Sequence, residues 1–246
     1  MGALAVASAM AWAYLLLGAG IEMERMDMGG GHVMAMQRGW DLPYAVLVLT
    51  MWVVMMAAMM LPTAAPTVLL VTALAEDRLD NSNLIPATAI LFASGYLLVW
   101  CAFGLVATLL QWGLDNAGLL SETMAFANSI LASTVLIAAG AYQWTSLKDT
   151  CLRHCRSPTA FLIRHWRRGM LGAVRTGVRH GLFCLGCCWM LMTLLFVSGL
   201  MNLVWVGAIA LLVLFEKTLP GGDAMSRFTG LVLIGWGGLT LTRIFE

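Results

Sequence analysis

The chain has 246 residues, of which 61% are hydrophobic and 11% are charged, and its mean hydropathy is +0.85. Soluble domains carry about 45–50% apolar and about 25% charged residues, so this composition excludes an ordinary soluble protein. It predicts an all-α, polytopic membrane protein whose first partner is the lipid bilayer. The formal net charge is only +1 and the basic residues gather in one loop, which excludes nucleic acid as a partner.

Apolar segments recur along the whole chain. A membrane-spanning helix needs about 20 predominantly apolar residues, and we predict a transmembrane bundle of about seven spans within a single membrane domain, residues 1–246. The expected spans are Ala3–Gly20, Tyr44–Ala75, Leu84–Trp112, Met124–Leu147, Gly177–Ser198, Leu203–Leu219 and Phe228–Ile244. Cap and stop residues such as Pro220 lie between them.

The basic residues predict how the bundle is oriented. The segment 148–168 carries Lys148, Arg153, Arg156, Arg164, Arg167 and Arg168. Short loops this basic stay on the cytoplasmic side of a membrane. We therefore expect a cytoplasmic N-terminus, an extracytoplasmic C-terminus and an outer loop at residues 22–43.

The outer loop is rich in methionine. Its candidate metal ligands are Met23, Met26, Met28, His32, Met34 and Met36, with a glycine run between the two halves. Thioether sulfur selects Cu(I), and imidazole accepts copper in either oxidation state. The loop is therefore a candidate site of copper capture. Silver binding is one alternative, and a loop lying at the membrane surface with methionines dipping into lipid is another.

The second expected span contains the stretch Trp52-Val-Val-Met-Met-Ala-Ala-Met-Met-Leu-Pro62. At about 100° per residue its methionines stack one turn apart, Met55 with Met59 and Met56 with Met60. We expect this stripe of sulfur to supply weak, successive copper sites. The alternative is core packing, because methionine is an adaptable gap filler.

Two prolines interrupt the same span. Pro62 removes the backbone hydrogen bond to the carbonyl of Ala58, and Pro66 repeats the break four residues later. Freed carbonyls are tolerated in lipid only if a neighbouring group satisfies them. We therefore expect a kink that opens room inside the bundle.

The fifth expected span carries a cluster of soft ligands. His180, Cys184 and Cys187 fall within about 60° of one helical face, and Cys188 lies about 100° from Cys187. Thiolate and imidazole suit Cu(I) or zinc, although tetrahedral zinc would need a ligand from another helix. The spacing of Cys184 and Cys187 also fits a dithiol that cycles with a disulfide. Cys101 is taken as a small apolar residue.

Two further groups lie toward the predicted cytoplasmic side. Glu216 and Lys217 end the sixth span, where ionisable residues are functional candidates, and a structural ion pair is the alternative. Cys151, His154 and Cys155 form a second Cys/His cluster in the basic loop, with a solvated pair of reduced thiols as its alternative.

Motifs of common enzymes are missing from the sequence. It contains no Gly-x-Ser-x-Gly, no phosphate-binding loop, no His-Glu-x-x-His and no Asp-Lys-Thr-Gly of ATP-driven metal pumps. We therefore expect no catalytic residue and no coupling to ATP.

Several short motifs in order resemble a known family. They are Trp52, Met55, Ala58, Met59, Met60, Pro62 and Pro66; Gly95, Tyr96 and Trp100; Tyr142, Gln143, Lys148, Cys151, Cys155 and Pro158; Gly181, Cys184, Gly186, Cys187, Cys188 and Trp189; Met201, Asn202 and Trp205; and Glu216, Lys217 and Pro220. With these residues the chain resembles the bacterial family catalogued as domain of unknown function 2182, described as predicted metal-binding integral membrane proteins. The resemblance implies a multi-pass protein of the bacterial inner membrane and a bound metal.

The favoured interpretation is a membrane protein that binds copper as Cu(I) and transports or delivers it, with a cuproprotein or a membrane complex as partner. A structural or assembly subunit of a larger membrane complex is the first alternative, because Gly- and Ala-rich helices and tryptophans also suit helix packing. A membrane thiol-disulfide oxidoreductase is the second.

Overall fold

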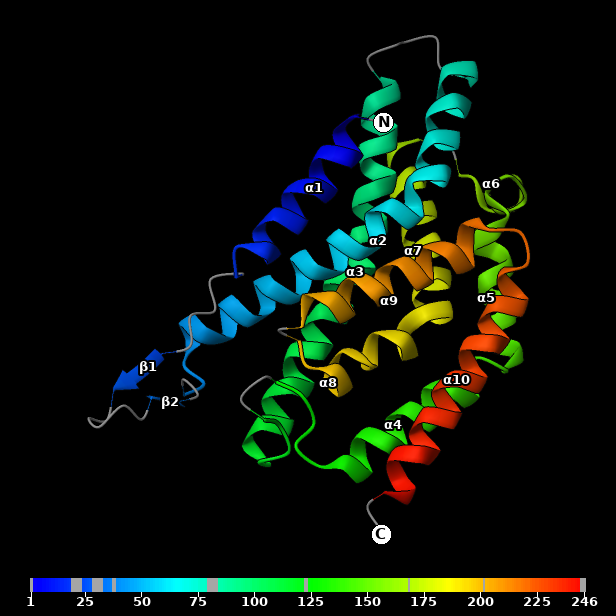
Figure 1. The fold of residues 1–246 in the computed structure, drawn as a ribbon. Helices are drawn as coiled ribbons and strands as arrows, with labels where there is room; N and C mark the ends of the chain where they lie inside the picture. Colours follow the sequence, from blue (N-terminus) through cyan, green and yellow to red (C-terminus); the bar gives the residue numbers. More distant parts are fainter. Residues whose placement is uncertain are drawn as a thin grey trace.

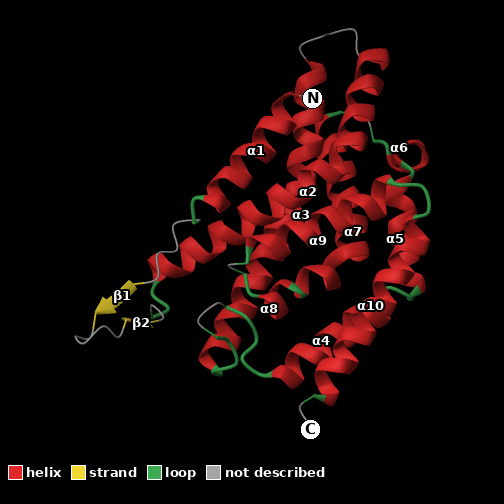
Figure 2. Ribbon diagram, viewed as in Figure 1, coloured by secondary structure: helices red, strands yellow, loops and turns green. Residues whose placement is uncertain are grey.

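The computed structural model describes residues 2–18, 24–27, 33–36, 39–78, 84–121, 124–167, 169–200 and 202–243. Within these ranges the chain folds into helices and one small antiparallel sheet (Figures 1 and 2). In chain order the elements are α1 (Gly2–Leu16), β1 (Glu24–Asp27), β2 (Val33–Met36), α2 (Leu42–Arg78), α3 (Leu84–Asn116), α4 (Ser129–Tyr142), α5 (Ser146–Arg156), α6 (Pro158–His165), α7 (Met170–Thr193), α8 (Leu195–Ser198), α9 (Leu203–Thr218) and α10 (Gly222–Thr242).

Three stretches of helix are long and apolar enough to cross a membrane, namely Leu42–Ala75, Ile85–Asn116 and Met170–Ser198. A fourth candidate is the pair α4 and α5, which bends by 64° at the break between the two helices. The described part of the chain therefore offers three or four candidate spans, and the prediction of seven is wrong.

The other three expected spans correspond to α1, α9 and α10, which fail to qualify as candidate spans for different reasons. With 15 and 16 residues, α1 and α9 reach about 22–24 Å, less than the roughly 30 Å of a hydrocarbon core. Although α10 has 21 residues, its glycines, its threonines and the charges of its first turns dilute its apolar content. All of these segments are helical, as expected, but being helical and apolar does not make them spans.

The two prolines lie inside α2, which remains one helix of 37 residues and changes direction along its course (Figure 1). The carbonyl freed by Pro62 is satisfied, because Ser8 Oγ of α1 donates a hydrogen bond to Ala58 O at 3.3 Å. The nearby Met60 carbonyl also accepts hydrogen bonds from Thr63 Oγ1 and Tyr96 OH. The side chain of Ser8 in α1 therefore supplies the hydrogen bond that Pro62 removes.

Glycines hold α3 and α7 close together. A Cβ at Gly177 would lie 2.0 Å from Phe92 O, and one at Gly95 would lie 2.3 Å from Val174 O. Small residues at such positions let two helix backbones approach closely, which is a common basis of packing in membranes. This contact places the cysteine-bearing α7 firmly against α3.

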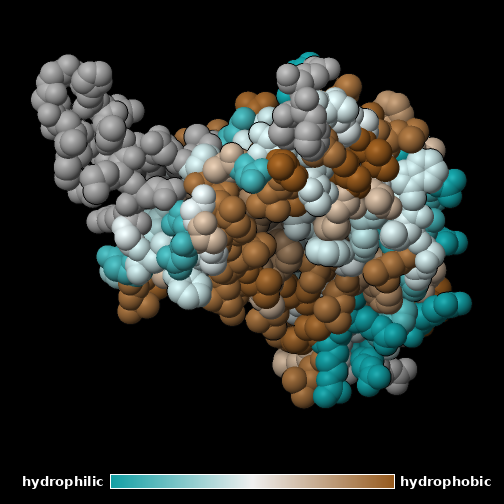
Figure 3. Space-filling model, turned by 90° about the horizontal axis from the view of Figure 1, so that it is seen from below, coloured by the Kyte–Doolittle hydropathy of each residue, from teal (hydrophilic) through white to brown (hydrophobic). Residues whose placement is uncertain are grey.

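The outer surface is suited to lipid. Figure 3 shows hydrophobic residues over much of the face seen from below, with hydrophilic ones gathered toward one side. On α3 the exposed apolar side chains Ile90, Leu98, Leu105 and Leu109 follow one helical face. Soluble proteins rarely expose such continuous apolar surface, so this surface supports membrane association. The side of the membrane on which each terminus lies stays a prediction.

Candidate metal site

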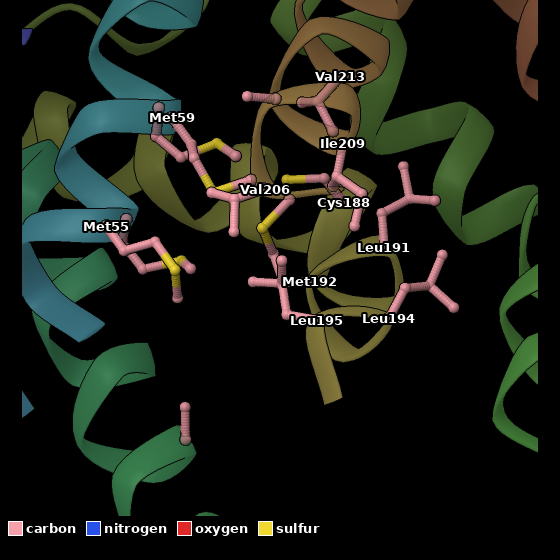
Figure 4. Close-up of a cluster of buried hydrophobic side chains, with 14 of the residues drawn as sticks. Met55, Met59, Cys188, Leu191, Met192, Leu194, Leu195, Val206, Ile209 and Val213 are labelled. Carbon is pink, nitrogen blue, oxygen red and sulfur yellow. The ribbon is translucent and has the colours of Figure 1, made fainter. Parts of the chain in front are cut away.

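The methionine stripe of α2 faces the interior. Met55, Met56, Met59 and Met60 are each at most 1% exposed. They belong to one apolar cluster with the cysteines of α7. Figure 4 shows Met55 and Met59 of α2 extending toward the part of α7 that carries Cys188 and Met192, with side chains of α9 beside them. Sulfur from two separate stretches of chain therefore shares one interior.

The three cysteines of α7 are buried within the same cluster. Cys184, Cys187 and Cys188 are each 1% exposed, and all three are free thiols. The Cys187 and Cys188 thiols donate to the Cys184 carbonyl, with sulfur to oxygen distances of 3.1 and 2.9 Å. Both thiols thus donate to a carbonyl of the preceding turn of α7.

Two more cysteines approach from α5. Cys155 Sγ lies 4.0 Å from Cys187 Sγ, and a Cβ at Gly186 would lie 2.7 Å from Cys151 Sγ, so Gly186 makes room for that sulfur. The sequence placed these cysteines in a basic loop as a separate group. Most of 148–168 is instead the helices α5 and α6, and α5 packs against α7. Because of this packing the cysteines of α5 and α7 form one group.

His154 takes no part in that grouping. Its ring stacks on Phe183 with 4.1 Å between ring centres, and its Nδ1 lies 2.8 Å from the Thr150 carbonyl.

A buried cation lies against the Cys184 sulfur. Lys217 Nζ is 2.9 Å from Cys184 Sγ and 3.5 Å from Thr63 Oγ1, while Tyr96 OH is 3.0 Å from the same sulfur. Sequence reasoning did not place Tyr96 or Thr63 in the site. The only signal was that Tyr96 occurs among the residues of the family resemblance.

The expected pairing of Glu216 with Lys217 is not the one that forms. Glu216 Oε2 lies 2.8 Å from Lys148 Nζ, which also donates to Gln143 Oε1. Adjacent residues on a helix point about 100° apart, so Glu216 and Lys217 reach different neighbours. The sequence assigned Lys148 to a solvated basic loop, yet its side chain is fully buried.

His180 lies among aromatic rings. Phe92, Tyr96 and Phe161 surround it, with ring centres 5.0–5.9 Å away. Its Nε2 is 3.4 Å from Thr67 Oγ1. The expected grouping of His180 with the cysteines as ligands of one ion therefore lacks a matching geometry.

The described part of the chain contains no group of three or more His, Cys, Asp or Glu side chains that could hold a metal ion. Structural zinc needs such a closed set, so zinc receives no support. The soft donors that do gather here are methionine thioethers and cysteine thiols, the ligand types that select Cu(I).

Three of the outer methionines, Met26, Met34 and Met36, lie in the antiparallel strands β1 and β2. In their register Met26 pairs with Met34, and Glu24 pairs with Met36. Met23, Met28 and His32 lie outside the described residues. The expected loop is therefore partly a two-stranded sheet, which places Met26 and Met34 opposite each other across the two strands.

Comparison with known proteins identifies a family. A family model described as PpoB2, copper chaperone, matches residues 49–240. The matched range runs from α2 into α10 and contains every cysteine of the cluster, whereas α1, β1 and β2 lie before it. No curated protein and no solved structure matches the chain.

Proposed function

The chain belongs to the PpoB2 family of copper chaperones, and from this premise we propose that it binds Cu(I) on sulfur inside the membrane and delivers it to a cuproprotein. Because the family is described as copper chaperones, we propose copper as the metal that the sequence led us to expect. The observation that carries the proposal is the buried sulfur cluster of α2, α5 and α7. Its proposed ligands are Met55, Met56, Met59, Met60, Cys151, Cys155, Cys184, Cys187 and Cys188.

The donor set suits an ion that has to leave again. Thioether sulfur is a neutral, soft ligand, and a row of such ligands offers successive weak sites, which conduction requires. Lys217 adds a second reason, because its ammonium group already occupies a place on Cys184 Sγ. A cation at that sulfur and an arriving Cu(I) repel each other strongly in a low-dielectric interior. We propose that this competition moderates the affinity of Cys184 for copper.

Capture and hand-over would lie at the two ends of this path. We propose that residues of the outer segment 22–43 receive copper first, namely Met26, Met28, His32, Met34 and Met36. Cys151 and Cys155 of α5 would pass the ion on. The same residues would serve transport across the membrane or delivery at one face.

Copper binding by the purified protein tests the proposal. The full-length protein in detergent is loaded with Cu(I) under anaerobic conditions, and bound copper is measured by elemental analysis and by competition with a chromogenic chelator. We expect the triple variant C184S/C187S/C188S to lose stoichiometric copper. The double variant M55L/M59L keeps apolar side chains of similar volume. We expect its affinity for Cu(I) to fall by about tenfold or more, because loss of a residue that only supports a metal ligand already has an effect of this size.

Two matched controls accompany these variants. C101S replaces a cysteine outside the cluster, and M10L replaces an exposed methionine of α1. Both are expected to bind copper as the wild type does. Unchanged copper content in the triple variant would overturn the proposal. In that case co-purification of a stoichiometric partner would favour an assembly subunit. The oxidoreductase would be favoured if two more cysteines are alkylated under reducing conditions than under oxidising conditions, as measured by mass spectrometry.

A further inference from the structure

A cavity of about 340 Å³ lies away from the sulfur cluster, where the chain passes from α6 into α7. It is lined by His165, Arg167, Arg175, Thr176 and Arg179. None of these residues is acidic, and three of them carry a permanent positive charge. His165 and Thr176 also take part in helix packing, whereas the three arginine side chains are exposed and are not part of the proposed copper path.

Local backbone geometry holds the lining residues in place. The chain reverses at Gly169, whose φ of +81° favours glycine, and α7 begins directly after it. Gly172 lets the linker lie close, since a Cβ there would be 2.3 Å from Arg167 O. Thr176 Oγ1 is 2.8 Å from Gly172 O and 3.3 Å from His165 O. Backbone contacts therefore fix one wall of the cavity, and the exposed side chains of Arg167, Arg175 and Arg179 project from it.

The positive charge in this cavity has no carboxylate partner among the described residues. Arg175 and Arg179 stand one turn apart on the same face of α7, and Arg167 joins them from the linker. The ion pairs found in the described ranges lie elsewhere, Lys148 with Glu216 and Arg156 with Asp223. Burial, together with the positive charge of Arg179, lowers the pKa of the His165 imidazole, so the guanidinium groups carry the charge at neutral pH.

We infer that this cavity binds a phosphate-bearing anion through the guanidinium groups of Arg167, Arg175 and Arg179. Guanidinium forks match phosphate oxygens in pairs and cannot lose their charge, which makes arginine the usual residue for such recognition. The hydroxyl of Thr176 lies in the same wall.

The surroundings indicate a lipid as the natural source of the phosphate. Exposed apolar side chains flank the cavity: Ile163 is 85% exposed, Leu171 75% and Met170 57%. Such side chains contact acyl chains when a helix end lies at the membrane surface. Basic pockets beside membrane helices bind anionic headgroups on this principle. A free phosphate ion would use the same donors without the apolar contacts.

Native mass spectrometry of the full-length protein in detergent tests the inference with three probes: dioctanoyl phosphatidic acid, inorganic phosphate and dioctanoylglycerol, which lacks a phosphate. We expect phosphatidic acid to remain bound and dioctanoylglycerol to be lost. In R175Q/R179Q the affinity for phosphatidic acid should fall by about tenfold or more, because two charge-assisted contacts are removed. R175K/R179K keeps the positive charge but lacks the paired guanidinium donors. Its affinity for phosphatidic acid should lie between those of the wild type and R175Q/R179Q.

The matched control is R153Q/R227Q, which removes two exposed arginines outside the cavity and changes the net charge equally. Its affinity should equal that of the wild type. Tight inorganic phosphate binding that R175Q/R179Q loses would support the site and identify a free anion as its ligand. The inference is overturned if no phosphate probe binds, or if the control loses as much affinity as R175Q/R179Q.

Discussion

The buried pair of Lys148 and Glu216 has an energetic role that the copper path does not explain. Both residues are at most 1% exposed, and among the described residues the buried atoms Glu216 Oε1 and Gln143 Nε2 have no hydrogen-bond partner. A buried ion pair gains little net stability over an apolar pair, but losing one partner strands the other charge. The intact pair therefore adds little net stability, but any packing of α5 and α9 that separates its two charges is strongly disfavoured.

A double-mutant cycle measures this constraint. Lys148→Met and Glu216→Gln should each lower the free energy of unfolding, and Lys148→Met should cost about 3–5 kcal/mol, because it leaves a carboxylate unpaired in the interior. The double variant should lose clearly less than the sum of the two. The measurement is unfolding in mixed micelles of increasing denaturing detergent.

Arg156→Gln is the control for this cycle, since it breaks the more exposed pair with Asp223 at 3.3 Å and should cost less than about 1 kcal/mol. Strict additivity of the two buried substitutions would contradict the role assigned to the pair.

At the scale of single elements, α2 depends on α1 where proline breaks it. The hydrogen bond from Ser8 Oγ to Ala58 O replaces the one that Pro62 cannot donate. Because an unsatisfied carbonyl in lipid is costly, this contact fixes where the short helix α1 lies along α2.

Ser8→Ala should therefore destabilise the protein by about 1–3 kcal/mol, the usual cost of a buried polar group left unpaired. In a Pro62→Ala background the helix can donate its own hydrogen bond to Ala58 O, so the same substitution should cost little. Thermal unfolding of the four proteins in one detergent gives both values. Ser94→Ala is the control, because Ser94 is exposed and bonds only its own helix at Ile90 O. Equal costs of Ser8→Ala in both backgrounds would refute the compensation.

The elements also separate what could be predicted from what could not. Apolar runs predicted helices at α2, α3, α7 and α9 but not at α5, and the 3.6-residue period predicted which methionines of α2 share a face. The break at residues 143–145 was missed because the apolar run of 124–147 continues through it. Hydropathy depends on composition and not on backbone conformation, so this segment was expected to be one unbroken span.

The candidate site was predictable only in part for a related reason. Helical spacing grouped Cys184 with Cys187, but it carries no information on what a neighbouring helix places opposite them. Tyr96 and Lys217 meet Cys184 through tertiary contacts among α3, α7 and α9. Likewise, Cys155 reaches Cys187 only because a segment expected to be a solvated loop forms α5 and packs on α7.

At the scale of the whole molecule, the basic segment and the methionine-rich outer segment 22–43 should face opposite sides of the membrane. From the positive-inside tendency we expect α6 in the cytoplasm, and α2 would then carry the chain to an extracytoplasmic Gly39. With a membrane-impermeant maleimide, Gly39→Cys should be labelled on intact cells. Arg164→Cys should be labelled only after the membrane is opened, and the wild type provides the background. The reverse pattern would invert the proposed sides of capture and delivery.

The close glycine contact between α3 and α7 limits which parts of the protein can move during delivery. Tyr96 and Cys184 belong to two helices whose backbones are in close contact at Gly95 and Gly177, where a larger side chain would not fit. We expect these two helices to move together, whereas Lys217 approaches the sulfur from α9, a separate helix. Exchange of the ammonium group for an ion at that sulfur then depends on displacement of α9 or of the lysine side chain alone.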